Sequence, residues 1–194
     1  MSDASPLPLR LCGPCVACCR WLQIDKPEIR KASGVPCRHL VEARGCAIHA
    51  ARPAICREWF CGWRQSAFFP EALRPDQSGV IVLMDEPAPA RPGEEPGAAL
   101  CLLLIAPVER VLNGPFVELV SRLLGAAVPV LLGLPGPPGA TGARVLVNNH
   151  ARSVADGQGL ADLLRALAAD LQASRFSPER YAHAGPDFGA ESRA

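Results

Sequence analysis

Aromatic residues, long apolar runs and clustered basic residues are scarce in this sequence. Its longest apolar stretch, Leu123 to Leu134, contains Pro129 and is shorter than the roughly 20 residues that a membrane helix needs. Residues 1–64 carry ten Arg and Lys against five Asp and Glu, but these cations do not form a long run. The composition therefore excludes a membrane span and gives little support to a nucleic-acid-binding function.

Signatures of catalysis are also absent. The sequence contains no G-x-S-x-G, no phosphate-binding Gly-Lys-Ser/Thr loop, no H-E-x-x-H, no strand-linked G-x-G-x-x-G and no C-x3-C-x2-C. The first residues lack the apolar core of a secretory signal, so we expect a cytoplasmic protein. In a reducing compartment, cysteines serve as metal ligands or redox groups more often than as disulfides.

Cysteine is what the sequence has in excess. Eight of the nine cysteines fall between residues 12 and 61: four in the run CGPCVACC, three in the run CAIHAARPAICREWFCGW, and Cys37 between the two runs. The eight, which we predict to be metal ligands, are Cys12, Cys15, Cys18, Cys19, Cys37, Cys46, Cys56 and Cys61. Cys101 stands apart in an apolar strand candidate, so we expect it to be a core residue.

The spacing of the first run is typical of metal sites. Zinc sites take two ligands from a tight C-x2-C turn, and Cys12, Cys15 and Cys18 repeat this spacing. The triple also matches the first three ligands of a ferredoxin run, whose fourth cysteine would stand where this chain has Leu22. Zinc or iron therefore fits the pattern, and an iron-sulfur cluster would need a remote fourth ligand.

The adjacent pair Cys18-Cys19 raises the question of one metal centre or two. In an extended chain, neighbouring side chains point to opposite faces, so one thiolate can join Cys12 and Cys15 while the other reaches elsewhere. Eight thiols allow two four-thiolate sites, or one site with several structural cysteines. We interpret His39 and His49 as surface or packing residues. The nearby cations expected to offset thiolate charge and lower thiol pKa values are Arg20, Arg38, Arg52 and Arg57.

Composition divides the chain into four parts. We predict a flexible lead-in (1–11), an irregular cysteine-rich metal-binding module (12–64), a small α+β portion (65–173) and a polar tail (174–194). The module is rich in turn formers and has little apolar sequence, so bound metal would have to supply much of its folding energy. Short helical turns are expected at residues 27–32 and 52–60.

The α+β portion shows alternating strand and helix patterns. We predict strands at residues 80–84, 100–106, 128–132 and 144–148. One helix is expected to follow the Asn113-Gly114-Pro115 turn and to end at Gly125, and a second, capped by Ser153, carries a leucine stripe. This order predicts an α+β fold with two helices on one face of a largely antiparallel sheet.

The cysteine pattern resembles a known family. CGPCVACC followed by GVPCRHL, GCAIH and ARPAICREWFC is similar to the bacterial CxxCxxCC cysteine-cluster proteins, which are described as zinc- or iron-chelating. The resemblance covers residues 12–64 and implies that the eight clustered cysteines are the ligands. His49 stands where relatives usually carry Tyr. A related pattern occurs in flagellin lysine methylases with an iron-sulfur centre, although no methyl-donor motif follows residue 64 here.

The sequence therefore predicts a metal-binding protein. Its expected partner is a zinc or iron ion held by the cysteine thiolates in one or two centres. The alternative is an iron-sulfur redox protein, or a component related to protein-lysine methylases.

Overall fold

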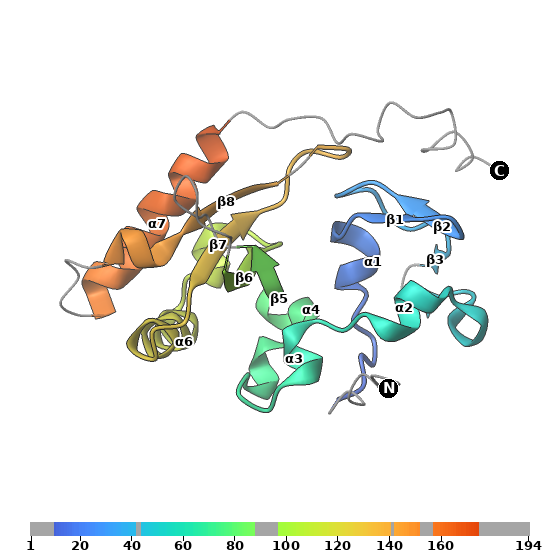
Figure 1. The fold of residues 1–194 in the computed structure, drawn as a ribbon, viewed down its shortest axis with the longest axis horizontal. Helices are drawn as coiled ribbons and strands as arrows, with labels where there is room; N and C mark the ends of the chain where they lie inside the picture. Colours follow the sequence, from blue (N-terminus) through green and yellow to red (C-terminus); the bar gives the residue numbers. More distant parts are fainter. Residues whose placement is uncertain (1–9, 42–43, 88–96, 141, 152–156, 175–194) are drawn as a thin grey trace.

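A four-stranded sheet forms the middle of the molecule (Figure 1). The structure, a computed structural model, describes residues 10–41, 44–87, 97–140, 142–151 and 157–174. The strands are β5 (Val80–Pro87), β6 (Ala98–Leu104), β7 (Val130–Leu134) and β8 (Ala143–Leu146), in the spatial order β5-β6-β7-β8. Two of the three pairings are antiparallel, and the β6-β7 pairing is parallel.

The parallel pairing follows from the helices between β6 and β7. After β6 the chain forms α5 (Val108–Val111) and α6 (Gly114–Gly125) before it returns as β7. A crossover of this kind brings the next strand back in the same direction. The short 135–142 connection instead reverses the chain, so β7 and β8 are antiparallel as predicted. The α+β fold with a largely antiparallel sheet is confirmed.

Two amphipathic helices cover one side of this sheet. In α6 the side-chain oxygen of Asn113 accepts a hydrogen bond of 3.1 Å from the Phe116 amide and so caps the helix. In α7 (Gly157–Ala173) the buried leucines are Leu160, Leu164, Leu167 and Leu171. Both helices contact β7 and each other. The predicted cap Ser153 lies outside the described residues.

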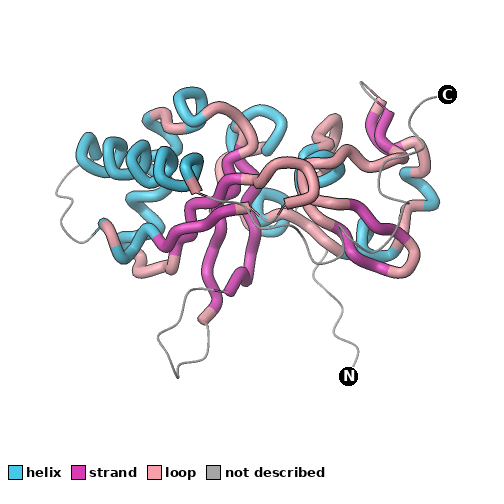
Figure 2. Tube along the Cα trace, turned by 90° about the horizontal axis from the view of Figure 1, so that it is seen from above, coloured by secondary structure: helices cyan, strands magenta, loops and turns pink. Residues whose placement is uncertain are grey.

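The cysteine-rich segment, residues 12–64, lies on the other side of the sheet in both ribbon and tube views (Figures 1 and 2). Its elements, together with those that connect it to β5, are short: α1 (Ala17–Trp21), β1 (Ile24–Lys26), β2 (Ile29–Lys31), β3 (Leu40–Val41), β4 (Gly45–Cys46), η1 (His49–Ala51), α2 (Ala54–Glu58), α3 (Gly62–Gln65), η2 (Glu71–Leu73) and α4 (Pro75–Ser78). The helix expected within residues 52–60 is present as α2.

The prediction of a helical turn at residues 27–32 is wrong. These residues form the turn and second strand of the β1-β2 hairpin, in which Lys26 pairs with Ile29. Proline fits the first position of a helix and also the second position of a tight turn, so Pro27 does not distinguish the two. The alternation in β2, where Ile29 and Lys31 are buried and Arg30 is exposed, is the period of a strand.

All four predicted strands are present with shifted boundaries: β6 begins and ends two residues earlier than predicted, and β8 ends at Leu146, before a short 3-10 helix (Val147–Asn149). β5 continues to Pro87 because its pairing with β6 resumes at Glu86 after an irregularity. β7 begins at Val130 instead of Val128 because the end of α6 occupies the preceding residues. Ala127 adopts a left-handed conformation (φ 55°), and the Val128 amide donates a hydrogen bond of 3.0 Å to the Leu123 carbonyl.

The hydrophobic core belongs to the sheet and its helices. Strands β6 and β7 are buried along almost their whole length, and Cys101 is completely buried, as expected of a core residue. Among the described residues from 12 to 60, by contrast, the buried apolar side chains are Ala17, Ile29 and Ala32. The cysteine-rich segment therefore has almost no apolar core of its own.

Several contacts join the cysteine-rich segment to the remainder of the protein. The tip of the β7-β8 hairpin reaches the segment, where the Gly139 amide donates a hydrogen bond of 3.0 Å to the Ser33 carbonyl. Arg10, from the predicted lead-in, donates to the carbonyls of Trp63 and Phe69 at 2.6 and 2.8 Å. Helix α3 packs on β5, with Gly62 against Val82. Within the described residues, no helix combines the length and apolarity needed to cross a bilayer.

The close approach at Gly62 predicts a large effect of one added methyl group. A Cβ at this position would lie 2.5 Å from Val82 Cγ1 and 2.9 Å from Met84 Sδ. Gly62→Ala should therefore lower the free energy of unfolding by about 1–3 kcal/mol, measured by urea denaturation. Gly125→Ala, in α6, is the matched control because no atom lies within 4 Å of its added Cβ. Equal stability of the two variants would contradict the packing of α3 on β5.

Candidate metal centre

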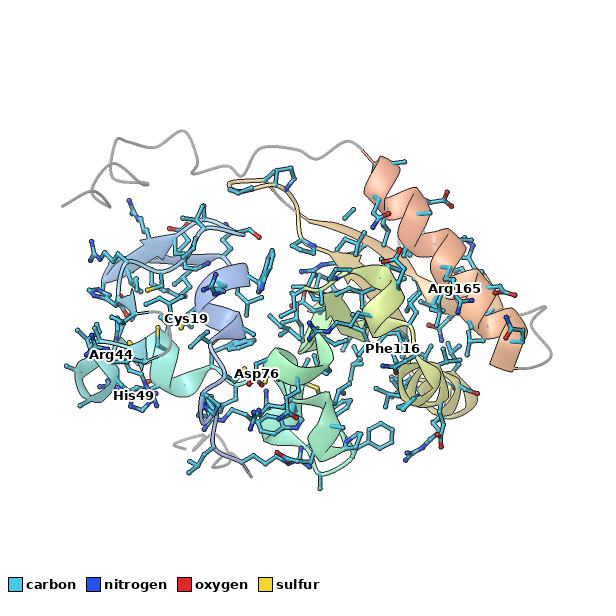
Figure 3. The ribbon with its side chains drawn as sticks, turned by 180° about the vertical axis from the view of Figure 1, so that it is seen from behind. Cys19, Arg44, His49, Asp76, Phe116 and Arg165 are labelled. Atoms are coloured by element: carbon cyan, nitrogen blue, oxygen red, sulfur yellow. The ribbon has the colours of Figure 1, made fainter. Side chains whose placement is uncertain are left out.

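All eight clustered cysteines line one cavity of about 340 Å³. None of the nine cysteines of the chain forms a disulfide, and Cys101 is the one that does not line the cavity. Arg44, His49 and Arg52 also contribute to the wall. Cys19, Arg44 and His49 lie together on the cysteine-rich side of the molecule, away from α6 and α7 (Figure 3). Cysteines that are 49 positions apart in sequence are thus gathered at one site.

The first part of the cavity wall is built by a tight turn and two helix starts. The Cys15 amide donates a hydrogen bond of 3.1 Å to the Cys12 carbonyl, which closes the predicted C-x2-C turn. Cys61 directly precedes α3. The two regions are tied together because Arg10 Nη1 donates to the Trp63 carbonyl at 2.6 Å and Arg64 Nε donates to the Arg10 carbonyl at 2.8 Å.

The second part of the wall is built around the β3-β4 hairpin. The Cys37 amide donates a hydrogen bond of 2.9 Å to the Cys19 carbonyl, so these two residues are adjacent in space. The Leu40 amide in turn donates to the Cys37 carbonyl at 2.9 Å, and Leu40 pairs with Cys46. Cys56, in α2, is close enough for the charges of Cys19, Cys37 and Cys46 to raise its thiol pKa, which burial raises most.

Burial and neighbouring thiols keep most of these cysteines protonated in the metal-free chain. Burial raises the pKa of Cys15 to about 11, and negative charge at Asp76 and Cys12 adds to this rise. Burial also raises the pKa of Cys61 and of Cys37. Several thiolates would repel one another here without a cation between them.

Cys19 is the exception. A side-chain hydrogen bond from Cys18 is the main cause that lowers the Cys19 pKa from its ordinary 9.0 to about 7, and the positive charges of Lys31 and Arg52 lower it further. The same hydrogen bond is the main cause that raises the pKa of Cys18. The metal-free cavity therefore holds its most acidic thiol at the junction of the two parts of the wall.

Two cations beside the cavity counter thiolate charge. Lys31 is 4% exposed, and its Nζ donates hydrogen bonds to the carbonyls of Arg20, Leu22 and Ala32 at 3.1, 2.6 and 3.1 Å. Arg52 contacts His49 through its guanidinium, while its Nε is buried without a hydrogen-bond partner. Buried positive charge of this kind favours thiolates nearby. The sequence predicted the role of Arg52 but not that of Lys31.

Backbone amides point at several of the sulfurs. Cys15 accepts hydrogen bonds from the amides of Ala17 and Asp76, and Cys37 accepts one from His39. Cys61 accepts from the amides of Trp63 and Arg64. Hydrogen bonds from the surrounding protein to the ligands orient them in metal sites and tune the metal. The Asp76 contact was not predicted because it comes from α4, outside the cysteine-rich sequence.

The side chains do not form a ready-made metal site. In the part of the chain that the structure describes, no three His, Cys, Asp or Glu side chains are grouped as they would be around an ion. The close triple expected of Cys12, Cys15 and Cys18 is thus not preformed. His49 is exposed and His39, half-buried, accepts a hydrogen bond of 3.3 Å from Arg38.

Comparison with protein-family models, curated proteins and solved structures gives no match to this chain. The geometry of the cavity and the chemistry of its thiols therefore carry the functional argument.

The pKa differences predict an order of thiol reactivity in metal-free protein. Cys19 should react with iodoacetamide fastest at neutral pH, and its rate should rise with pH to a plateau above about pH 8, because the thiolate is the nucleophile. Cys101 should stay unmodified, because burial raises its pKa to about 12. Peptide mass spectrometry measures each rate.

A matched pair of variants tests the cause. Cys18→Ala removes the hydrogen-bond donor and should shift the Cys19 rate profile to higher pH, whereas exposed Arg57→Gln should leave it in place. An unshifted profile in Cys18→Ala would refute the assigned interaction.

Proposed function

We propose that this chain is a metal-binding protein in which cysteine thiolates hold zinc or iron. The observation that carries the proposal is the convergence of all eight clustered cysteines on one cavity, with Cys101 elsewhere in the core. Eight thiols around a single space suit soft-ligand metal binding, since thiolates favour zinc and iron-sulfur clusters. The likeness of residues 12–64 to the CxxCxxCC proteins supports the same assignment.

The lack of an apolar core in the cysteine-rich segment is a second support. A segment of about 50 residues that buries so few apolar side chains gains little free energy from the hydrophobic effect. Structural zinc contributes an apparent binding free energy of about 10–16 kcal/mol in small modules. Metal bound in the cavity would therefore supply stabilisation that the small apolar core of the segment cannot.

Metal binding here consists of proton release followed by ligand rearrangement. Thiols such as Cys15 and Cys61, whose pKa values are raised by burial, must lose their protons to the solvent when the ion binds. The positive ion replaces the repulsion between thiolates with attraction. Lys31 and Arg52 offset the remaining negative charge beside Cys19. Because the ligands are protonated in acid, metal affinity should fall as the pH falls.

An iron-sulfur protein is the second candidate function. The triple Cys12, Cys15 and Cys18 has ferredoxin spacing, and the amides directed at Cys15, Cys37 and Cys61 are the kind of hydrogen bond that sets cluster potential. Under this alternative the chain would act in electron transfer, or as a component related to protein-lysine methylases. A cytoplasmic setting suits either candidate, because thiol ligands persist in a reducing compartment.

Anaerobic purification followed by metal analysis and a visible spectrum separates the two candidates. Stoichiometric zinc in a colourless protein supports a zinc site and contradicts the cluster. Iron and acid-labile sulfide with broad visible absorption support the cluster and contradict zinc. Protein that neither retains metal nor binds added Zn²⁺, Co²⁺ or iron and sulfide would refute metal binding altogether.

Chelation should unfold the cysteine-rich segment selectively. Removal of metal by a strong chelator should raise amide hydrogen exchange throughout residues 12–64, while α7 (Gly157–Ala173) keeps its protection because its leucines are held by the sheet core. Cys15→Ser should have the same effect. Cys101→Ser is the control and should retain metal. Unchanged exchange in residues 12–64 after complete metal loss would contradict a folding role for the metal.

A further inference from the structure

We propose that the eight cysteines form two separate four-thiolate metal centres, and that Cys18 and Cys19 divide between them. The first set is Cys12, Cys15, Cys18 and Cys61; the second set is Cys19, Cys37, Cys46 and Cys56. This assignment rests on the proposed function. It deepens that function by specifying the ligands and number of centres.

Backbone contacts define the first set independently of any sulfur. The Cys12-Cys15 turn is closed by its own hydrogen bond of 3.1 Å. The Arg20 amide donates a hydrogen bond to the Val16 carbonyl at the start of α1, so Cys18 follows the turn within one helical stretch. Cys61 joins this group because the Arg10 guanidinium donates a hydrogen bond to the Trp63 carbonyl and Arg64 Nε donates one to the Arg10 carbonyl. The chain just before Cys12 thus lies beside the chain just after Cys61.

Backbone contacts join Cys19, Cys37 and Cys46 of the second set, and Cys56 lines the same cavity. Cys19 and Cys37 are joined by the hydrogen bond of 2.9 Å between the Cys37 amide and the Cys19 carbonyl. Cys37 and Cys46 are brought together by the β3-β4 hairpin, in which Leu40 bonds to the Cys37 carbonyl and pairs with Cys46. Arg52 acts on both Cys19 and Cys56 through its charge, which places Cys56 in the same neighbourhood.

The electrostatic neighbours of each thiol follow the same division. The charge of Cys12 raises the pKa of both Cys15 and Cys61. The charges of Cys19 and Cys46 raise the pKa of Cys37, and the charges of all three other members of the second set raise the pKa of Cys56. The Cys18-Cys19 pair supplies the one interaction between sets among the thiols whose pKa is shifted. Apart from the hydrogen bond between Cys18 and Cys19, these interactions all lie within a set, and the two sets meet at this pair.

The position of the pair in α1 (Ala17–Trp21) explains how adjacent residues serve different centres. Successive side chains on an α-helix diverge by about 100°, so Cys18 and Cys19 leave the helix in different directions. A tetrahedral ion takes four thiolates, and eight thiolates therefore match two ions. The sequence predicted an extended chain at Cys18 and Cys19, and the structure has a helix there instead. The two side chains still point in different directions.

Cobalt titration of the full chain tests the assignment. Metal-free protein is titrated anaerobically with Co²⁺, and thiolate-to-cobalt absorption is followed to saturation. The full chain and the control Cys101→Ser should saturate at two equivalents. Cys12→Ser/Cys61→Ser should keep one tetrathiolate centre, and Cys37→Ser/Cys46→Ser should keep the other, so each paired variant saturates at one equivalent with half the absorption.

The outcomes separate this inference from the proposed function. Saturation of the full chain at one equivalent, or loss of all tetrathiolate absorption in either paired variant while α7 stays protected from hydrogen exchange, would overturn the two centres and leave metal binding intact. Absence of cobalt binding by the full chain would instead overturn the proposed function. If one paired variant does not fold, Cys15→Ser/Cys61→Ser or Cys46→Ser/Cys56→Ser repeats the test for the same set.

Discussion

The near absence of an apolar core in the cysteine-rich segment is the constraint on which the account depends. From residue 12 to residue 60 the described chain buries Ala17, Ile29 and Ala32, while β6 and β7 are buried almost throughout. Conformational entropy opposes the ordering of every residue in this segment. The hydrogen bonds that join its short elements contribute only about 1 kcal/mol each. Under the proposed function, bonds from thiolates to metal would supply the stabilisation that the segment lacks.

The sheet and its helices provide what the cysteine-rich segment lacks. α6, α7 and the four strands form a core that does not involve the clustered thiols, and the segment docks on it through α3, Arg10 and the β7-β8 hairpin tip. The docked segment keeps the cysteines along one cavity even where their side chains are not grouped around an ion. Under the proposed function, a bound ion would draw these side chains together and hold the segment in this docked arrangement.

Charge sets the other condition on the site. Buried thiolates repel one another, and the chain moderates this repulsion with Lys31, Arg52 and amides directed at sulfur. Lys31 is itself buried, and three carbonyl oxygens replace the water that its ammonium group would bind. The cost of placing this cation inside is offset where a thiolate such as Cys19 lies nearby. Lys31 comes from β2 and the Asp76 amide from α4, both outside the cysteine runs, whereas Arg52 lies within the second run, between η1 and α2.

Local patterns predicted most of the α+β portion, because its strands are short apolar runs, its helices carry apolar residues at helical spacing, and turn residues lie between them. The turn before α6 and the leucine stripe of α7 were predicted in this way, whereas the cap that Asn113 supplies was not. The cysteine-rich segment was less predictable because its structure depends on contacts between distant residues. Pro27 fits a turn as well as a helix, Lys31 reaches Cys19 only through the hairpin, and Asp76 reaches Cys15 from α4. The spacing identified the eight clustered cysteines, but it did not indicate which of them belong to each of the two proposed sets.

X-ray absorption spectroscopy at the metal edge of the loaded full chain tests the central claim most directly. For zinc, the account predicts a first shell of four sulfur atoms at about 2.3 Å, without nitrogen or oxygen. A cluster would show iron with sulfur ligands alone and a short iron-iron distance. A first shell dominated by nitrogen or oxygen would contradict the claim that the cysteines of this cavity are the metal ligands.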